Sequence, residues 1–148
     1  MIFFYGLVGA IVLIDQLTKF LALRFLSSQT PLSIVPKVLD FTLVKNPGVA
    51  FGLFSGFAPL LFTLITCSLV FLFFIANRSH HEASLSSRWA LSLILGGAIG
   101  NWIDRLRFAA VIDFIDFRVW PVFNIADSAI TIGVCLFALN LFRPEKKT

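Results

Sequence analysis

The chain alternates between long apolar stretches and short polar connections. Four apolar runs, at 3–26, 57–76, 89–108 and 122–142, follow one another along the sequence. Each is close to the roughly 20 helical residues needed to cross about 30 Å of hydrocarbon. Backbone groups in lipid must be hydrogen-bonded within the segment, which favours helices. We therefore predict an all-α polytopic membrane protein, with four transmembrane helices in one integral-membrane domain over residues 1–148.

Two of the three connections carry a different pattern. Apolar and polar residues alternate in "LDFTLVKN" at 39–46 and in "VIDFIDFRVW" at 111–120, as in half-exposed strands. The connection between them along the chain, "NRSHHEASLSSR", reads as a solvated loop. The first and third connections of a four-span protein emerge on the same face. We therefore expect a small extramembrane β element on that face alone.

Composition and charge agree with a membrane location. The chain is 58% hydrophobic and 14% charged, its mean hydropathy is +0.92, and its net charge is +4. The basic residues gather at the ends of the spans and in short loops, which suits lipid headgroups and argues against a nucleic-acid partner. Leaving aside Lys19 within the first span, five lie on the side of the termini and six on the other. The distribution of Lys and Arg therefore does not orient the chain.

The polar residues within and next to the spans segregate to one side. Odd-numbered spans end, and even-numbered spans begin, on the face that carries the first and third connections. The residues placed toward this face are Asp15, Lys19, Asn46, Asn101, Asp104, Arg105, Asp113, Asn124 and Asp127. The residues placed toward the opposite face are His80, His81, Glu82 and Glu145. A metal site or a Ser–His site is therefore not expected at the polar face.

Two helical clusters have plausible structural roles. Asp15 and Lys19 are four residues apart with the acid first, which predicts a helix-packing ion pair. In "GGAIGNWIDRLR" the small residues Gly96, Gly97 and Gly100 allow another helix to approach closely. The two cysteines, Cys67 and Cys135, fall within spans and are expected to be small buried hydrophobes.

The same glycine-rich segment continues with three polar residues on one helical face. Asn101, Asp104 and Arg105 occupy positions i, i+3 and i+4. One interpretation is a salt bridge in which Asp104 orients Arg105. The other is an Asn and an Arg held ready to bind a substrate backbone. The segment "KNPGVAFG" is read first as a turn, although Asn46 could also bind an extended peptide.

The most informative residues are carboxylates near the fourth span. Asp127 lies about one turn into it, three residues after Asn124, and no Lys or Arg occurs between positions 118 and 143. An ionisable residue inside a span is a functional candidate. Two neighbouring carboxyl groups can share a proton, so that one acts as general base and the other as general acid. Asp113 and Asp116 are both candidates for the partner. Strand alternation directs them to opposite faces without showing which one faces Asp127.

Five segments together resemble the lipoprotein signal peptidase (signal peptidase II) family of intramembrane aspartic proteases. They are "DQLTK" at 15–19, "NPGVAF" at 46–51, "GNWIDR" at 100–105, "VIDF" at 111–114 and "FNIAD" at 123–127. The resemblance extends over essentially the whole chain. It implies that Asp113, rather than Asp116, pairs with Asp127 as a catalytic dyad. It further implies that five residues bind substrate or support the dyad, namely Asn46, Gly48, Asn101, Arg105 and Asn124. Asp15, Lys19 and Asp104 would be structural.

The resemblance also implies the reaction and the setting. The expected substrate is a prolipoprotein, cut just before its diacylglyceryl-modified cysteine, without a cofactor or metal. The enzyme would be a monomer among the lipids of the bacterial cytoplasmic (inner) membrane, with both termini in the cytoplasm and the active site toward the outer face. The alternative is a small proton- or ion-coupled transporter that uses buried aspartates. The segregation of polar residues disfavours it, because a pathway needs polar groups through its whole depth.

Overall fold

The structure is a computed structural model that describes residues 2–47, 64, 67–68, 71 and 84–141. Its long helices are α1 (Ile2–Phe25), α3 (Leu85–Phe108) and α4 (Ile125–Leu141). Its strands are β1 (Leu32–Val35), β2 (Leu39–Asn46) and β3 (Val111–Asp116). The protein is therefore rich in helix with a small sheet, as predicted. The expected span at 57–76 lies outside the described residues except at positions 64, 67, 68 and 71.

Local contacts at their N-termini explain why two helices differ from their predicted bounds. Helix α3 begins at Leu85, because the Ser84 side chain accepts a hydrogen bond of 3.1 Å from Ser87 N. Helix α4 begins at Ile125 instead of 122, because Phe123 forms a β-bridge with Ile115. Within the described part of the chain, α1 is long and apolar enough to cross a membrane, and α4 is apolar but shorter. The arrangement of four spans stays a prediction.

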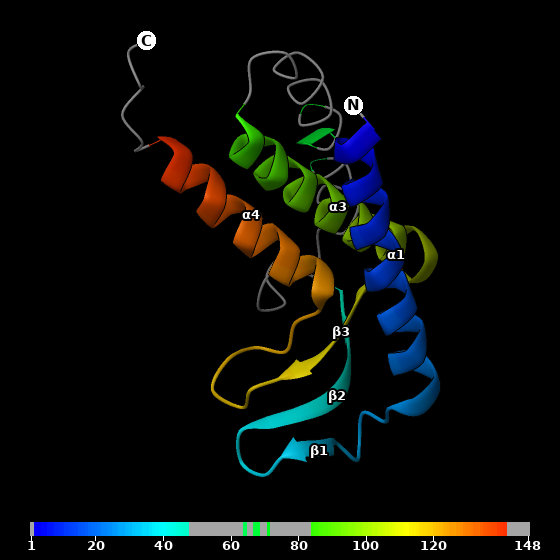
Figure 1. The fold of residues 1–148 in the computed structure, drawn as a ribbon. Coiled ribbons are helices and arrows are strands. Elements are labelled where there is room, and N and C mark those ends of the chain that lie inside the picture. The colour runs from blue at the N-terminus through cyan, green and yellow to red at the C-terminus, as the bar shows by residue number, and fades with distance from the viewer. Residues whose placement is uncertain (1, 48–63, 65–66, 69–70, 72–83, 142–148) are drawn as a thin grey trace.

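Helix α3 lies between α1 and α4 (Figure 1). Its glycines lie at both contacts, as predicted. A Cβ atom on Gly96 would come within 2.9 Å of Ile11 in α1, and one on Gly97 would meet the Ala126 carbonyl oxygen in α4. On α4, a Cβ atom on Gly133 would come within 2.8 Å of the Ala90 carbonyl oxygen in α3. The absence of side chains at these positions lets the helix backbones approach closely.

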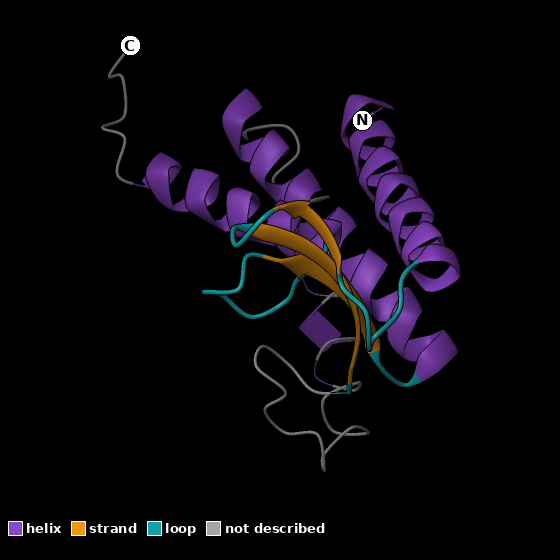
Figure 2. Cartoon of the chain, turned by 90° about the horizontal axis from the view of Figure 1, so that it is seen from below, coloured by secondary structure: helices purple, strands orange, loops and turns teal. Residues whose placement is uncertain are grey.

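The strands form one antiparallel sheet in the order β1-β2-β3. The predicted alternating segments correspond to β2 and to β3, whereas β1 had no counterpart among the predictions. The sheet lies across one end of the helices, where α1 ends and α4 begins (Figures 1 and 2). The β element therefore joins the first and third connections on one face, as expected.

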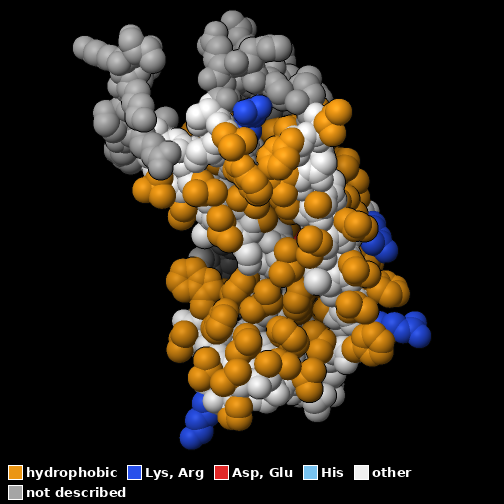
Figure 3. All heavy atoms as spheres, in the orientation of Figure 1, with side chains coloured by type: hydrophobic (Ala, Val, Ile, Leu, Met, Phe, Trp, Pro, Cys, Tyr) orange, Lys and Arg blue, Asp and Glu red, His pale blue; other side chains and the backbone are white. Residues whose placement is uncertain are grey.

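Apolar side chains cover much of the outer surface of both helices and sheet (Figure 3). They include Leu13, Phe20 and Phe25 on α1, and Val134 and Leu139 on α4. Such a surface is typical of a protein solvated by lipid. The expectation that the cysteines are buried was wrong, because both are free and exposed. A small apolar side chain is tolerated on a surface of this kind as well as in a core.

Candidate active site

The predicted dyad residues come from two elements, strand β3 of the sheet and helix α4. Asp113 lies on β3, opposite Val44 of β2, and is buried. Asp127 lies in the first turn of α4 and is half-buried. Because α4 begins later than expected, Asp127 is the third residue of the helix. A carboxylate at this position is stabilised by the helix dipole and by unpaired backbone N–H groups.

Asn124 and Asp127 form a reciprocal cap at the start of α4. Asn124 Oδ1 accepts a hydrogen bond of 2.8 Å from Asp127 N, and Asp127 Oδ2 accepts one of 3.3 Å from Asn124 N. An N-cap side chain followed three residues later by an acceptor is a capping box. The segment "FNIAD" contains this signal, so the capping role of Asp127, in addition to its candidate catalytic role, could have been recognised from the sequence.

Asn124 also links the cap to Asp113. Its Nδ2 donates to Asp113 Oδ1 at 2.7 Å and to the Ile112 carbonyl oxygen at 3.2 Å. Asn46 Nδ2, from the end of β2, donates to Asp113 Oδ2 at 3.1 Å. Both oxygens of Asp113 therefore accept hydrogen bonds from carboxamides. The buried Asn124 carboxamide therefore contacts both candidate catalytic residues: its nitrogen donates to the Asp113 carboxylate, and its oxygen accepts from the Asp127 backbone.

The environment of Asp113 favours its protonated form. Burial, together with the negative charge of Asp127, raises the pKa of the Asp113 carboxyl from the ordinary 3.8 to about 6. The hydrogen bonds from Asn46 and Asn124 act in the opposite direction. A carboxyl group with a pKa near 6 can exchange a proton close to neutral pH, as acid–base catalysis requires.

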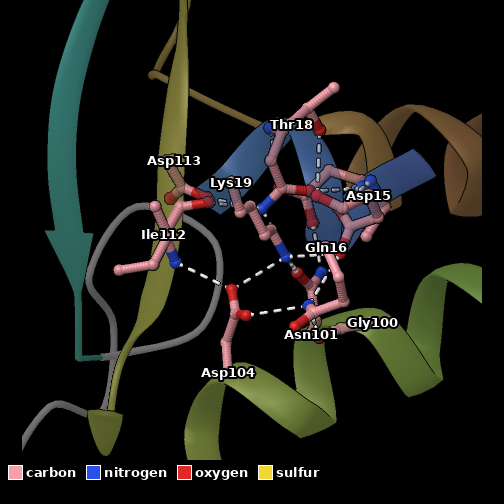
Figure 4. A network of polar contacts seen from close by, with 12 residues as sticks. Asp15, Gln16, Thr18, Lys19, Gly100, Asn101, Asp104, Ile112 and Asp113 are labelled. Atoms are coloured by element: carbon pink, nitrogen blue, oxygen red, sulfur yellow. Dashed lines mark hydrogen bonds and ion pairs between the residues drawn. The ribbon is translucent and has the colours of Figure 1, made fainter. Parts of the chain in front are cut away.

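A second layer of polar contacts centres on Lys19 (Figure 4). Its Nζ lies 2.9 Å from Asp15 Oδ2 and 2.8 Å from Asp104 Oδ2. It also donates a hydrogen bond of 2.8 Å to Asn101 Oδ1. The predicted Asp15–Lys19 ion pair is thus present. Asn101 Nδ2 in turn donates to Asp127 Oδ1 at 2.7 Å, so this layer reaches the candidate dyad.

The remaining contacts of Asp15 and Asp104 join α1 to α4 and α3 to β3. Asp15 Oδ1 accepts a hydrogen bond of 2.9 Å from Ala126 N in the first turn of α4. Asp104 Oδ2 accepts one of 3.0 Å from Ile112 N on β3. Gln16, which the sequence interpretation did not single out, donates to Asp104 Oδ1 at 3.0 Å and to the Gly100 carbonyl oxygen at 3.1 Å. Its position next to Asp15 in "DQLTK" could have indicated that Gln16 belongs to this polar cluster.

Arg105 lies on the same side of α3 as the other polar residues. Its guanidinium donates to the Asn101 carbonyl oxygen at 3.1 Å and interacts electrostatically with Asp127, Asp113 and Asp104. The sequence suggested that Asp104 forms a salt bridge with Arg105. In the structure the ion pair of Asp104 is with Lys19, and its interaction with Arg105 is electrostatic. Gly48, the remaining predicted site residue, lies outside the described residues.

Asp116 belongs to a separate polar group at the far end of the sheet. It accepts hydrogen bonds from Arg118 N at 2.7 Å and from Thr42 Oγ1 at 3.3 Å. Arg118 Nε also donates to the buried Asp40 Oδ2 at 2.6 Å, an ion pair that the sequence interpretation missed. Asp113, by contrast, contacts Asn46 and Asn124. The structure thus places the two aspartates in different surroundings.

Metal ligation finds no support in the part of the chain that the structure describes. No group of three or more His, Cys, Asp or Glu residues there is arranged to hold a metal ion. The two histidines lie outside these residues. The described site brings together two carboxyl groups, which can give and take protons, with carboxamides and a guanidinium near them.

Comparison with known proteins is consistent with this site and its surroundings. A family described as Signal peptidase (SPase) II matches residues 7–143. The lipoprotein signal peptidase of Halothermothrix orenii is 38% identical over 144 residues, which cover 96% of this chain and 97% of that protein. That of Thermodesulfovibrio yellowstonii is 43% identical over 136 residues, 86% of each chain.

Solved structures agree with the sequence relatives. A bacterial membrane enzyme determined by the in meso method at 2.3 Å resolution superposes with a TM-score of 0.88 and 31% identity. The alignment covers 98% of this chain and 93% of that one. A second such structure, at 1.9 Å resolution, gives a TM-score of 0.84 and 32% identity. The family match, the relatives and the fold agree, and the chain belongs to the signal peptidase II family.

Proposed function

We propose that the protein is an aspartic endopeptidase that removes the signal peptide of prolipoproteins, cleaving just before the diacylglyceryl-modified cysteine. The observation that carries this proposal is the hydrogen-bonded arrangement of Asp113, Asn124 and Asp127 in a member of the signal peptidase II family. The names of the relatives supply the substrate class, since they are lipoprotein signal peptidases.

In the proposed reaction, the two aspartates share one proton. The ionised carboxylate removes a proton from a water molecule, whose oxygen attacks the carbonyl carbon of the scissile peptide bond. The protonated carboxyl group gives its proton to the carbonyl oxygen at the same time. When the tetrahedral intermediate collapses, the C–N bond breaks and the first carboxyl group passes its proton to the leaving amine. The second carboxylate takes the proton of one hydroxyl group as the C=O bond re-forms, which restores the shared proton of the dyad. No metal or organic cofactor enters these steps.

The surrounding residues would position the substrate. Asn46 lies at the end of β2 and contacts Asp113. In the proposed reaction its carboxamide would therefore lie beside the attacked bond. Arg105 would bind a backbone carbonyl oxygen or stabilise the developing oxyanion, as a cation close to both aspartates can do. In the membrane, this end of the helices would face the outer side, with both termini in the cytoplasm. The protein would act as a monomer surrounded by lipid.

The proton- or ion-coupled transporter is less well supported. The polar residues of α1, α3 and α4 that contact one another gather at the end of the helices next to the sheet. Nearer the opposite end, the packing between α1 and α3 includes an apolar cluster of Phe4, Val8, Leu91 and Leu95. A coupled pathway needs polar groups or water on both sides of the membrane.

A cleavage assay tests the proposal directly. The purified protein in detergent is mixed with a prolipoprotein substrate that carries the diacylglyceryl group, and the shorter product is resolved on a gel. We expect cleavage of the lipid-modified substrate and none of its unmodified precursor. Absence of cleavage, or equal cleavage of both substrates, would contradict the proposed specificity.

A further inference from the structure

Lys19 lies outside the dyad but at the centre of the hydrogen bonds that reach it. Its ammonium contacts Asp15 Oδ2, Asp104 Oδ2 and Asn101 Oδ1 at 2.8–2.9 Å (Figure 4). An ammonium group has three donors and no acceptor. These three contacts therefore use its full hydrogen-bonding capacity, and the side chain is only 2% exposed.

The contact with Asn101 determines how that carboxamide is oriented. Because Lys19 can only donate, Asn101 must turn its oxygen toward Lys19 and its nitrogen the other way. This nitrogen lies 2.7 Å from Asp127 Oδ1. If the carboxamide were rotated by 180°, an oxygen would face the carboxylate and a nitrogen would face the ammonium, and both contacts would be repulsive. The Lys19 contact therefore ensures that Asp127 receives an N–H group.

The second carboxamide continues the same ordering toward Asp113. Asn124 Nδ2 donates to Asn101 Oδ1 at 3.2 Å and to Asp113 Oδ1 at 2.7 Å. Its own oxygen accepts from Asp127 N at 2.8 Å. One buried ammonium thus orders two carboxamides, and each of these presents an N–H group to one member of the dyad. Hydrogen bonds donated to a carboxylate favour its ionised form.

We propose that Lys19 is a positioning residue of the dyad, which through Asn101 and Asn124 keeps the carboxylates of Asp127 and Asp113 oriented and able to hold negative charge. This role goes beyond joining α1 to α3, and it rests on the proposed function. Among the described residues, the charged groups around the dyad are Asp15 and Lys19 on α1, Asp104 and Arg105 on α3, and the two aspartates themselves. Lys45 on the neighbouring β2 is exposed.

The direction in which a substitution should shift the pH dependence of activity follows from these charges. Against the effects of burial and of Asp127, the positive charge of Lys19 lowers the pKa of Asp113. Removal of this charge should therefore make the dyad harder to ionise, so that a higher pH is needed for activity. Removal of the negative charge of Asp104, the partner of Lys19, should have the opposite effect. A purely structural role predicts no such pair of opposite shifts.

The experiment is the pH dependence of kcat/KM for cleavage of the lipid-modified substrate in detergent. We compare the unchanged protein with Lys19→Met and with Asp104→Asn, whose remaining carbonyl oxygen can still accept from Ile112 N. We expect the acid limb to move up by about one pH unit in Lys19→Met and down by a similar amount in Asp104→Asn. Thermal unfolding of each variant measures stability separately.

Arg118→Met is the matched control, because it also removes a cation from a buried carboxylate, Asp40, in the separate polar group of the sheet. It should lower the unfolding temperature and leave the pH profile unchanged. If both Lys19→Met and Asp104→Asn lowered the rate equally at every pH, Lys19 would be only structural. If Lys19→Met did not fold, the result for Asp104→Asn would decide. An acid limb of its pH profile at the same pH as in the unchanged protein would overturn the inference. An unchanged protein that cleaved no lipid-modified substrate would overturn the proposed function and, with it, this inference.

Discussion

Asn124 and Asp127 each satisfy a backbone N–H group of the other, at 2.8 Å and 3.3 Å, where α4 begins. Asp127 is therefore both the third residue of a helix cap and the candidate partner of Asp113. The cap holds one of its oxygens and Asn101 holds the other, so the carboxylate has little freedom to rotate. The N-terminus of α4 thus fixes the orientation of a carboxylate that can transfer protons.

We predict that Asp113→Asn and Asp127→Asn each lower the cleavage rate by at least about a hundredfold, because an amide keeps the shape of the carboxyl group but cannot exchange its proton. Both variants should remain folded. An Asn oxygen at position 127 can still accept from Asn124 N at the α4 cap, and one at position 113 can still accept from the Asn124 carboxamide. The gel-based cleavage assay measures the loss, with thermal unfolding as the check of folding. Near-normal turnover by either variant would refute the dyad.

Asp116→Asn should be tolerated, with a cleavage rate within a few-fold of the unchanged protein. Asp116 contacts Arg118 N and Thr42 at the far end of the sheet, and an Asn side chain can keep one acceptor there. The assay is the same, run beside Asp113→Asn. A loss as large as that of Asp113→Asn would mean that the wrong aspartate of "VIDFID" had been placed in the dyad.

Asp113 should make the folded protein less stable as the pH rises. Its pKa is about 6 when folded and about 3.8 when unfolded, so the folded state binds the proton more tightly. This stabilisation is complete below about pH 4 and is lost as the pH rises through 6. The loss amounts to at most about 3 kcal/mol. Unfolding temperatures from pH 4 to pH 8 should therefore fall more for the unchanged protein than for Asp113→Asn. Parallel curves would show that Asp113 does not titrate in this range.

Gly97→Ala should destabilise the helix packing by roughly 1–3 kcal/mol, because its Cβ would meet the Ala126 backbone oxygen, which cannot move aside without shifting α4. Since Ala126 is next to Asp127, activity should fall as well. Gly9→Ala on α1 is the matched control: nothing lies within 4 Å of the added Cβ, and alanine favours helix. Thermal unfolding compares the two. Equal stability of the two variants would argue against close α3–α4 packing.

The proposed membrane orientation can be read from cysteine accessibility in intact cells. After Cys67 and Cys135 are replaced by Ala, Ser33→Cys on β1 should react with a membrane-impermeant thiol reagent. Ser86→Cys, in the first turn of α3 at the opposite end of the molecule, should react only after the inner membrane is opened. Labelling of Ser86→Cys alone in intact cells would invert the topology and place the dyad on the cytoplasmic side.

Much of the fold could be predicted because it depends on local patterns. Long apolar runs predicted the helices now seen as α1, α3 and α4, and alternation predicted β2 and β3. The ion pair of Asp15 and Lys19 is a property of residues four apart on one helix. The gathering of polar residues at one end followed from the parity of the spans. Helix bounds were less accurate, because the caps at Ser84 and Asn124 decide them.

The contacts that build the site could not be derived from spacing. The hydrogen bond from Ala126 N to Asp15 Oδ1 joins residues 111 positions apart, and that from Lys19 to Asn101 joins residues 82 apart. Their formation depends on which helix faces pack together, and the close contacts at Gly96 and Gly97 determine these faces. The exposure of Cys135 and the pairing of Asp40 with Arg118 depend on the same three-dimensional arrangement. The sequence by itself therefore determined which residues are polar, which segments are helical and toward which end each lies. Only the tertiary structure decided which donor meets which acceptor, because a hydrogen bond depends on the distance between atoms in space and not on their separation along the chain.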